Sequence, residues 1–426
     1  MVTRTPIRVF ASPHPGRAAA ATARGDIGVA LYHIGRPELA GLGASLLPAV
    51  TKTLPRTPSI RAWDFLSITL AIHAADRFVM RSEAEDSWTR MIALDVELVE
   101  PDPWVAQAAA LADALRFLSS DIWYLRFRPG GQPPPPIDAH LTDRDCACLF
   151  SGGLDSLIGA IDLVHDGRWP LLVSQASPKE GPAQSKLAEA IGLSQHRFEG
   201  RASERWRQPY EPSSRARSVL FIGYGALAAS TIAPQGASGE LIVPENGLIS
   251  INPPLTRRHI GSLSTRTTHP HFIASLQRVL DATGLEVTIN NPYGGRTKGE
   301  MLAAGRANNP ILDQIAASSY SCGKGKRLNQ HCGRCVPCLI RRASFHAAGL
   351  ADATGYWADE LSENTSNEDV AAMRFAAASL AQKDVKRWAA DAGPLPLDPI
   401  RRALYVEVVR RGMTDVRDFL ATINWT

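Results

Sequence analysis

Residues 145–164, with the sequence DCACLFSGGLDSLIGAIDLV, constrain the fold more than any other segment of the chain. The apolar run at residues 146–150 is typical of a strand that is buried on both faces of a parallel sheet. From Leu157 onward, apolar residues recur with helical spacing. Between the two patterns, Gly152 and Gly153 permit a backbone turn that a Cβ atom would hinder. The segment therefore predicts a strand, a glycine turn and a helix in immediate succession.

This predicted arrangement is suited to binding an anion. Unpaired backbone amides at the start of a helix favour negative charge, and glycine lets a phosphate approach them closely. The chain contains no G-x-x-x-x-G-K-[ST] sequence, which excludes the commonest class of nucleotide hydrolase. A tight turn that binds nothing is the alternative interpretation of the same residues.

Length and composition limit the remaining choices. With 426 residues and 45% apolar content, the chain exceeds what one core usually holds, so we expect roughly two or three domains. The net charge of +4 does not by itself indicate a nucleic-acid partner. We find neither an apolar run of membrane-spanning length nor the apolar core of a signal peptide, and we expect a cytoplasmic protein without a membrane partner. The low cysteine content also fits a reducing compartment.

A segment rich in proline and glycine, residues 129–137, predicts the main domain boundary. Its four consecutive prolines favour a stiff, extended linker. We expect an α+β accessory domain at residues 1–128, an α/β domain at 138–350 and a helical region at 351–426. In the first of these parts, strand-like patterns occur at residues 7–10, 27–34, 91–99 and 122–128, and helical patterns at 60–80 and 102–118. Asp76 lies in the first helical pattern, where core packing and a solvated face explain the polar residues.

Three positions in the predicted α/β domain could contact a bound phosphate or substrate. The helix expected at residues 213–232 carries Arg215 and Arg217 in its first turn, where the helix dipole favours anions. A phosphate between them would explain this placement, and two exposed arginines are the alternative. Lys298 begins a helix after the last predicted strand and could reach phosphates as a mobile charge. A solvated lysine is the alternative there.

Glu245 and Asn246 follow the strand predicted at residues 240–243. Ligands of open parallel sheets bind beyond the carboxyl ends of the strands, so we expect these two side chains near a substrate. A carboxylate and an amide suit a guanine-like edge, whereas an Asn-Gly turn is the alternative interpretation. The loop at residues 250–270 is long and basic, which is typical of a lid or a binding loop.

Cys322 and the closely spaced Cys332, Cys335 and Cys338 predict a metal centre. Paired short spacings let one turn of backbone bring several thiolates to one zinc ion. Because four protein ligands leave no position for a catalytic water, the site should be structural. An iron–sulfur cluster is the rival, but the fourth cysteine expected after a further three residues is replaced by Arg342.

Together these motifs support a resemblance to a known family. The S-G-G-x-D-S sequence at residues 151–156 resembles the signature of the PP-loop ATP pyrophosphatases. Followed by T-K-x-E at 297–300, then S-C and C-x-x-C-x-x-C, it is similar to QueC, the 7-cyano-7-deazaguanine synthase family. The resemblance covers about residues 145–350. In its long N-terminal part and its helical tail, the chain is similar in architecture to the QatC proteins of the Qat antiphage defence system.

The resemblance implies a fold and an activity. The fold would be a PP-loop (adenine nucleotide alpha hydrolase-like) parallel sheet with helices on both faces. The activity would be that of an ATP-dependent ligase that adenylates a carboxylate of a 7-deazapurine-type substrate, with Mg²⁺ beside ATP and structural Zn²⁺. Carried over to this chain, the ATP-binding residues are Ser151, Gly152, Gly153, Asp155, Ser156 and Arg217. Asp155, Lys298 and Arg217 would be catalytic, Glu245 and Asn246 would contact the substrate, and Cys322, Cys332, Cys335 and Cys338 would bind zinc.

Two segments depart from the QueC pattern. Residues 174–180 lack its glycine-glutamine-arginine character, and residues 244–247 differ from its base-recognition stretch. The activated group could therefore pass to ammonia or to an amine on a partner protein held by the N-terminal domain, in antiphage defence. A tRNA-modifying PP-loop enzyme and a non-catalytic nucleotide-binding scaffold are the alternatives. A homodimer is also compatible with the resemblance.

Overall fold

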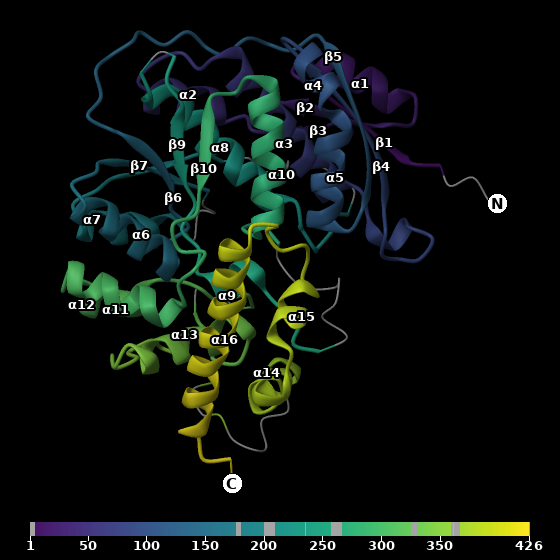
Figure 1. Ribbon diagram of the computed structural model, residues 1–426. Helices are drawn as coiled ribbons and strands as arrows, with labels where there is room; N and C mark the ends of the chain where they lie inside the picture. The colour runs from purple at the N-terminus through teal and green to yellow at the C-terminus, as the bar shows by residue number, and fades with distance from the viewer. Residues whose placement is uncertain are drawn as a thin grey trace.

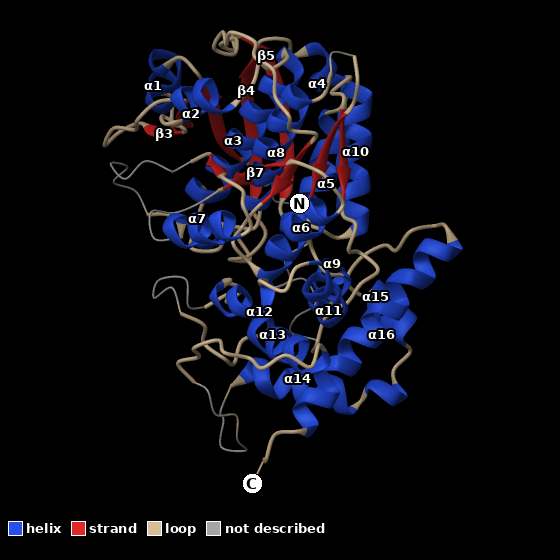
Figure 2. Cartoon of the chain, turned by 90° about the vertical axis from the view of Figure 1, so that its left-hand side faces the viewer, coloured by secondary structure: helices blue, strands red, loops and turns tan. Residues whose placement is uncertain are grey.

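The computed structural model describes residues 5–175, 180–199, 209–234, 236–256, 266–324, 330–358, 361 and 367–425. Two five-stranded sheets and the helices that flank them make up its upper part, and the described residues of the lower part form helices and loops (Figures 1 and 2). Much of the basic loop predicted at 250–270, including Arg257, Arg258 and His259, lies outside the described residues. Among the described residues, no helix combines the length and the apolar character that crossing a membrane would require.

The first sheet is parallel throughout and has the order β3-β2-β1-β4-β5. Its strands are β1 (Ile7–Ser12), β2 (Ile27–Leu31), β3 (Ala40–Leu42), β4 (Met91–Leu98) and β5 (Ile122–Pro129). The helices of this part are α1 (Pro15–Ala23), α2 (Leu46–Thr53), α3 (Ile60–Phe78), α4 (Asp102–Ala106) and α5 (Ala108–Ser119). We expected an α+β arrangement here, and this expectation was wrong. Helices connect β1 to β2, β3 to β4 and β4 to β5, and such crossovers return the chain in the same direction.

The second sheet is also parallel and has the order β10-β9-β6-β7-β8, which confirms the predicted α/β class. Its strands are β6 (Cys146–Leu149), β7 (Pro170–Ser174), β8 (Gln195–Arg197), β9 (Gly239–Ile242) and β10 (Val287–Asn290). Its helices include α6 (Leu154–His165), α7 (Gly181–Ala190), α8 (Arg217–Ile232), α10 (Pro270–Thr283), α11 (Lys298–Asn308) and α12 (Leu312–Ile315). Because β6 lies between β7 and β9, the strand order reverses at β6, where open parallel sheets bind ligands.

Helices α3 and α8 pack against each other and join the two sheets (Figure 1). The contact is tight, because a Cβ atom on Gly223 of α8 would overlap the side chain of Thr69 on α3. One apolar cluster runs through the joint, from Val9 and Leu94 in the first sheet to Leu149 and Leu241 in the second. The two sheets therefore share a continuous hydrophobic core.

The C-terminal helices form a separate apolar cluster, and the predicted helical character of this region is confirmed. They are α13 (Val336–Ala347), α14 (Glu368–Ala378), α15 (Val385–Ala390) and α16 (Pro399–Ala421). The cluster also includes Leu248 and Ile251 of α9 (Gly247–Ile251), which begins shortly after β9. The long helix α16 thus packs against the segment that follows β9 in the second sheet.

Candidate active site and metal centre

The predicted strand, glycine turn and helix are present between β6 and α6. Gly153 is the N-cap residue of α6, and Gly152 has a φ of 77° in the left-handed region. The Nε2 atom of Gln184 donates a hydrogen bond of 2.8 Å to the carbonyl oxygen of Ser151. A Cβ atom on Gly152 would lie 2.7 Å from Cγ of Gln184. Both the backbone angle and the close side chain therefore require glycine at this position.

Hydroxyl groups satisfy the amides of the turn through long hydrogen bonds. The amide of Gly153 donates to Oγ of Ser151 over 3.3 Å, and the amide of Leu154 donates to Oγ of Ser321 over 3.4 Å. Ser156 Oγ donates to the carbonyl oxygen of Gly153 over 3.0 Å. Because the amide contacts are long and point from the start of a helix, the oxygens of an anion can replace them.

A cavity of about 350 Å³ opens beside this turn. It lies in the size range of small-molecule sites. Its walls come from the turn, from the segments after β9 and β10, and from the edge of the cysteine cluster. The lining residues are Ser151, Gly153, Leu154, Asp155, Ser156, Glu180, Pro244, Glu245, Ile249, Lys298, Tyr320, Ser321, Cys322, Gly323 and Pro337.

Asp155 lies at the centre of the polar contacts in the cavity. Its Oδ1 forms an ion pair with Lys298 Nζ, and both side chains are buried, so the solvated alternative for Lys298 does not hold. Its Oδ2 accepts hydrogen bonds from Nδ2 and from the amide of Asn246, over 2.7 and 3.1 Å. Burial alone would raise the pKa of Asp155, but the Lys298 ammonium and the hydrogen bonds from Glu245, Lys298 and Asn246 hold it below its ordinary value.

Glu245 lies half-buried beside Asp155, and its pKa is shifted in the opposite direction. Burial, and then the Asp155 carboxylate, raise the pKa of Glu245 well above its ordinary value. The neutral form of Glu245 is therefore favoured beside the Asp155 carboxylate. Asn246 caps α9, because its Oδ1 accepts from the amide of Ile249 over 3.1 Å. Its amide group thus orients Asp155 and α9 at once.

Helix α8 begins at Arg217, four residues later than we expected. Arg217 is not among the described residues that line the cavity. The anion at this helix start is Asp76 of α3, whose Oδ2 accepts from the amide of Ala216 over 2.8 Å and from Ser214 Oγ over 3.0 Å. Asp76 is fully buried, which differs from the solvated position that we allowed for it. Arg215 lies 4.3 Å from the centre of the Trp88 ring rather than in solvent. A carboxylate of the chain itself therefore accepts from the backbone at this helix start.

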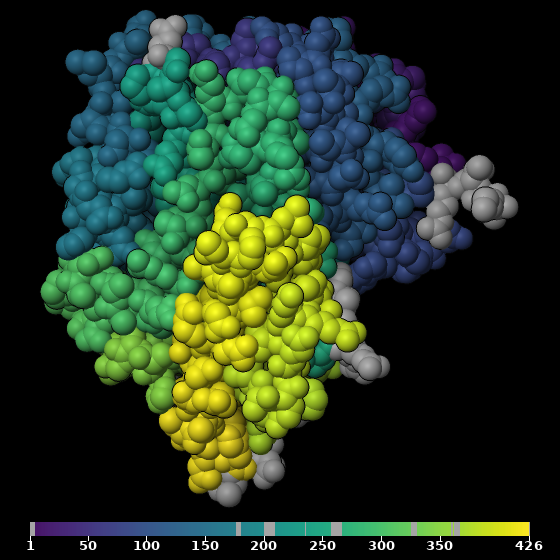
Figure 3. All heavy atoms as spheres, viewed as in Figure 1, coloured from purple at the N-terminus to yellow at the C-terminus, as the bar shows by residue number. Residues whose placement is uncertain are grey.

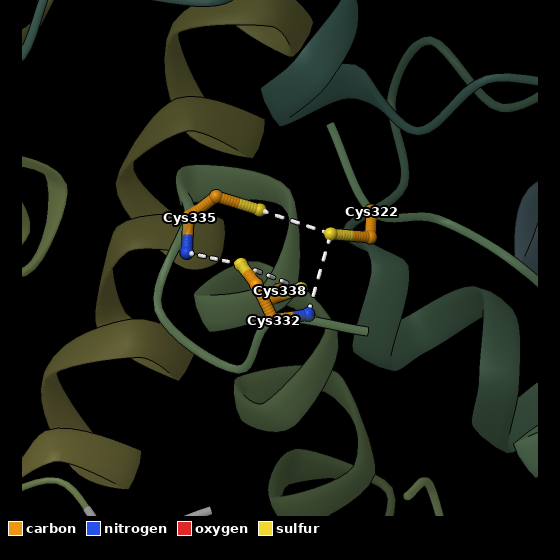
Figure 4. Close-up of side chains that lie close together, drawn as sticks. All are labelled: Cys322, Cys332, Cys335 and Cys338. Atoms are coloured by element: carbon orange, nitrogen blue, oxygen red, sulfur yellow. Dashed lines mark hydrogen bonds between the residues drawn. The ribbon is translucent and has the colours of Figure 1, made fainter. Parts of the chain in front are cut away.

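The four predicted metal ligands converge (Figure 4). Their Sγ atoms all lie within 4.8 Å of one another, and the pairs Cys322–Cys335 and Cys332–Cys338 are each 3.9 Å apart. Zinc–sulfur bonds of about 2.3 Å in a tetrahedron place sulfurs about 3.8 Å apart, so this donor set fits zinc. The amides of Cys332 and Cys335 donate to the sulfurs of Cys322 and Cys332, over 3.3 and 3.2 Å. Such hydrogen bonds stabilise thiolates.

Several residues of the site could not be identified from sequence. Ser321 and Tyr320 precede Cys322, and Glu180 and Gln184 come from the segment around the start of α7. Only the position of Ser321 beside a metal ligand hinted at its contact with the turn. Gln184 has no local signal, because its role depends on α7 packing against the turn.

Residues 267–349 match the family model described as "Queuosine biosynthesis protein QueC". The chain is 36% identical over 90 residues to the 7-cyano-7-deazaguanine synthase of Paracoccus denitrificans (strain Pd 1222), and 38% identical over 90 residues to that of Rhizobium etli (strain CIAT 652). Each match covers 20% of this chain and 36% of the relative. The chain thus spans about a third of the length of these curated relatives.

The region matched by the family model contains β10, Lys298 and the four clustered cysteines, whereas the glycine turn of residues 151–156 lies before it. The turn and the matched region nevertheless meet in one cavity, because Lys298 and Cys322 line it together with Ser151 and Asp155. The chain therefore combines a parallel α/β fold of the PP-loop type with a QueC-like region.

Proposed function

We propose that this chain is an ATP-dependent ligase that adenylates a carboxylate of a 7-deazapurine-type substrate and transfers the activated group to a nitrogen nucleophile. One observation carries the proposal: the glycine turn, the Asp155–Lys298 pair and Glu245 line one cavity with Cys322 at its edge. The likeness to 7-cyano-7-deazaguanine synthases supports the substrate class.

In this proposal the turn binds the phosphates of ATP. The amides of Gly153 and Leu154 exchange their long contacts with serine hydroxyls for phosphate oxygens. Lys298 supplies positive charge where pyrophosphate leaves, and Asp155 keeps this ammonium oriented until ATP enters. Mg²⁺ would accompany ATP, since a divalent cation neutralises phosphate charge, and Glu180 and Asp155 are carboxylates that could hold it.

Glu245 makes the cavity tolerant of a carboxylate substrate. Two ionised carboxylates in the wall would repel a third negative group, but the raised pKa of Glu245 favours its neutral form beside the Asp155–Lys298 pair. A neutral carboxyl group can also donate a hydrogen bond to an oxygen of the substrate. Attack of the substrate carboxylate on the α-phosphorus of ATP then forms an acyl adenylate and releases pyrophosphate.

The nitrogen nucleophile completes the reaction by displacing AMP. It would be ammonia or an amine of a partner protein, and the first sheet would hold such a partner. This finer part of the proposal extends to a role in antiphage defence. It is supported by the architectural resemblance to QatC and by the departures from the QueC pattern at residues 174–180 and 244–247.

The test is release of pyrophosphate from ATP in the presence of Mg²⁺ and 7-carboxy-7-deazaguanine. We expect release only when both substrates are present. Asp155→Asn and Lys298→Met should each lower kcat/KM by about 100-fold or more, because each removes charge from the reacting site. Asp166→Asn is the matched control, since this exposed aspartate lies at the other end of α6 and should leave turnover unchanged.

Other outcomes would point to the alternatives. Binding of ATP without release of pyrophosphate under any substrate would favour a nucleotide-binding scaffold. Release that depends on tRNA and falls steeply with salt would favour a tRNA-modifying enzyme. Unchanged turnover in Asp155→Asn would overturn the assignment of the site.

A further inference from the structure

Helix α16 lies across the two turns that deliver the partners of Asp155. One turn precedes α9 and ends at Asn246, and the other precedes α11 and leads into Lys298, the first residue of that helix. The surface of α16, yellow in Figure 3, lies directly beside the green surface of the segments from the second sheet. This helix lies outside the region that matches the QueC family model, residues 267–349.

Arg411 of α16 contacts both the first turn of α11 and the segment before it. Its Nε donates to Oε1 of Glu300 over 2.6 Å, and its Nη2 donates to the carbonyl oxygen of Gly295 over 2.8 Å. Glu300 in turn accepts from the amide of Thr297 over 2.9 Å, while Thr297 Oγ1 accepts from the amide of Glu300 over 3.1 Å. Arg411 therefore holds the capping box that Thr297 and Glu300 form at the start of α11, and Lys298 lies directly after Thr297 in this box.

Helix α16 packs closely against both turns at three glycines. A Cβ atom on Gly295 would lie 2.7 Å from the side chain of Leu404, and one on Gly294 would lie 2.9 Å from the hydroxyl of Tyr405. On the other turn, a Cβ atom on Gly247 would lie 2.6 Å from Val408. Successive residues on one face of α16 thus contact both turns.

The two turns are also bonded to each other. The amide of Gly247 donates to the carbonyl oxygen of Arg296 over 2.8 Å. Asn246 directly precedes Gly247, and Lys298 follows Arg296 by two residues. These two side chains bind the two oxygens of Asp155. Movement of α16 would therefore reach both partners of Asp155 together.

We propose that Arg411 is a positioning residue, through which α16 fixes the first turn of α11 and so holds Lys298 at the candidate site. Its effect on turnover rests on the proposed function, but its effect on Lys298 does not. Arg411 and Glu300 are each about 40% exposed, and exposed ion pairs contribute little to stability. The protein should therefore stay folded when Arg411 is lost. Because the start of α11 then loses its contact with α16, we expect Lys298 to be displaced.

The test compares neighbouring arginines of α16. Arg411→Gln removes the contacts to Glu300, and Arg411→Lys keeps a cation there. Arg410→Gln is the control, because Arg410 pairs within its own helix, with Glu407, and with no other acidic side chain in the described part of the chain. The rate of reductive methylation of Lys298 is measured by peptide mass spectrometry on the full chain without substrate, with Lys324 as an internal reference. We expect the Lys298 rate to rise about 10-fold in Arg411→Gln, and to rise less in Arg411→Lys.

The outcomes separate the inference from the proposed function. If the Lys298 rate in Arg411→Gln equals that of wild type, or rises equally in Arg410→Gln, the positioning role is wrong. A rise of methylation at Lys324 and Lys298 together would indicate general unfolding and would also overturn it. If the wild-type protein releases pyrophosphate, kcat in Arg411→Gln should fall about 10-fold with little change in the KM for ATP. If it releases none, the labelling result still decides the role of Arg411.

Discussion

The two sheets of this protein have the same architecture but different carboxyl edges. Each has five parallel strands, and in each the strand order reverses beside the first strand. The turn after β6 carries adjacent glycines, whereas the turn after β1 reads Ser12-Pro13-His14-Pro15. Proline lacks an amide proton, so the start of α1 offers fewer donors to an anion than the start of α6. Parallel topology alone therefore does not make a phosphate site.

The packing of side chains at the two edges adds to the difference. At the edge of the first sheet, Glu97 is buried and accepts from Ser12 Oγ over 2.6 Å. The chain after β5 closes over it, since a Cβ atom on Gly130 would lie 2.9 Å from the Glu97 carboxyl carbon. At the edge of the second sheet, Lys298 brings a cation to an open cavity. The first edge is filled by its own side chains, and the second is built to receive a ligand.

Loss of the metal should have the largest effect, and it should be confined to the second half of the molecule. Cys335→Ser should abolish zinc binding, because it removes one of the four thiolate ligands. The effect on folding should be large, since structural zinc contributes about 10–16 kcal/mol in small zinc domains. We expect faster hydrogen exchange in α13 and unchanged exchange in β1 and β4, measured by mass spectrometry. Cys148→Ala, a buried cysteine outside the cluster, should retain zinc. Equal zinc content in Cys335→Ser and wild type would contradict the site.

A matched pair of glycine substitutions tests the two turns directly. Gly152→Ala should destabilise the protein by about 1–2 kcal/mol from the left-handed backbone alone, and the contact with Gln184 adds to this. Gly16→Ala should be neutral or stabilise by up to about 1 kcal/mol, because Gly16 lies in α1 with open space around it. Urea unfolding measures both, and ATP binding should weaken only in Gly152→Ala. Equal losses in the two variants would remove the distinction between the turns.

A third effect concerns the joint between the sheets. Burial, and then the charges of Arg217 and Arg77, lower the pKa of His73 on α3 to about 3. Below its ordinary value of about 6.5, the unfolded chain takes up a proton at His73 that the folded chain refuses. Stability should therefore fall as the pH drops from about 6.5 towards 3.

His73→Leu should remove this part of the pH dependence. The variant should gain stability relative to wild type as the pH is lowered from 7 to 5, measured by urea unfolding at each pH. Parallel stability curves for the two proteins would show that His73 does not couple the joint to pH.

The sequence by itself determined the local features of this protein. The strand and turn before α6, the four clustered cysteines and most strand positions of both sheets follow from residue spacing over a few turns of chain. These features depend on neighbours in the sequence, and hydrophobic periodicity and glycine positions report such neighbours directly.

Only the tertiary structure decided the rest. Periodicity does not give the direction of neighbouring strands, so the first sheet was expected as α+β and is parallel. The carboxylate at the start of α8 comes from Asp76, which precedes it by 140 residues, and the cation that pairs with Glu300 in α11 comes from Arg411. Charges satisfy one another through space, and a sequence pattern shows which groups need a partner without showing which distant group supplies it.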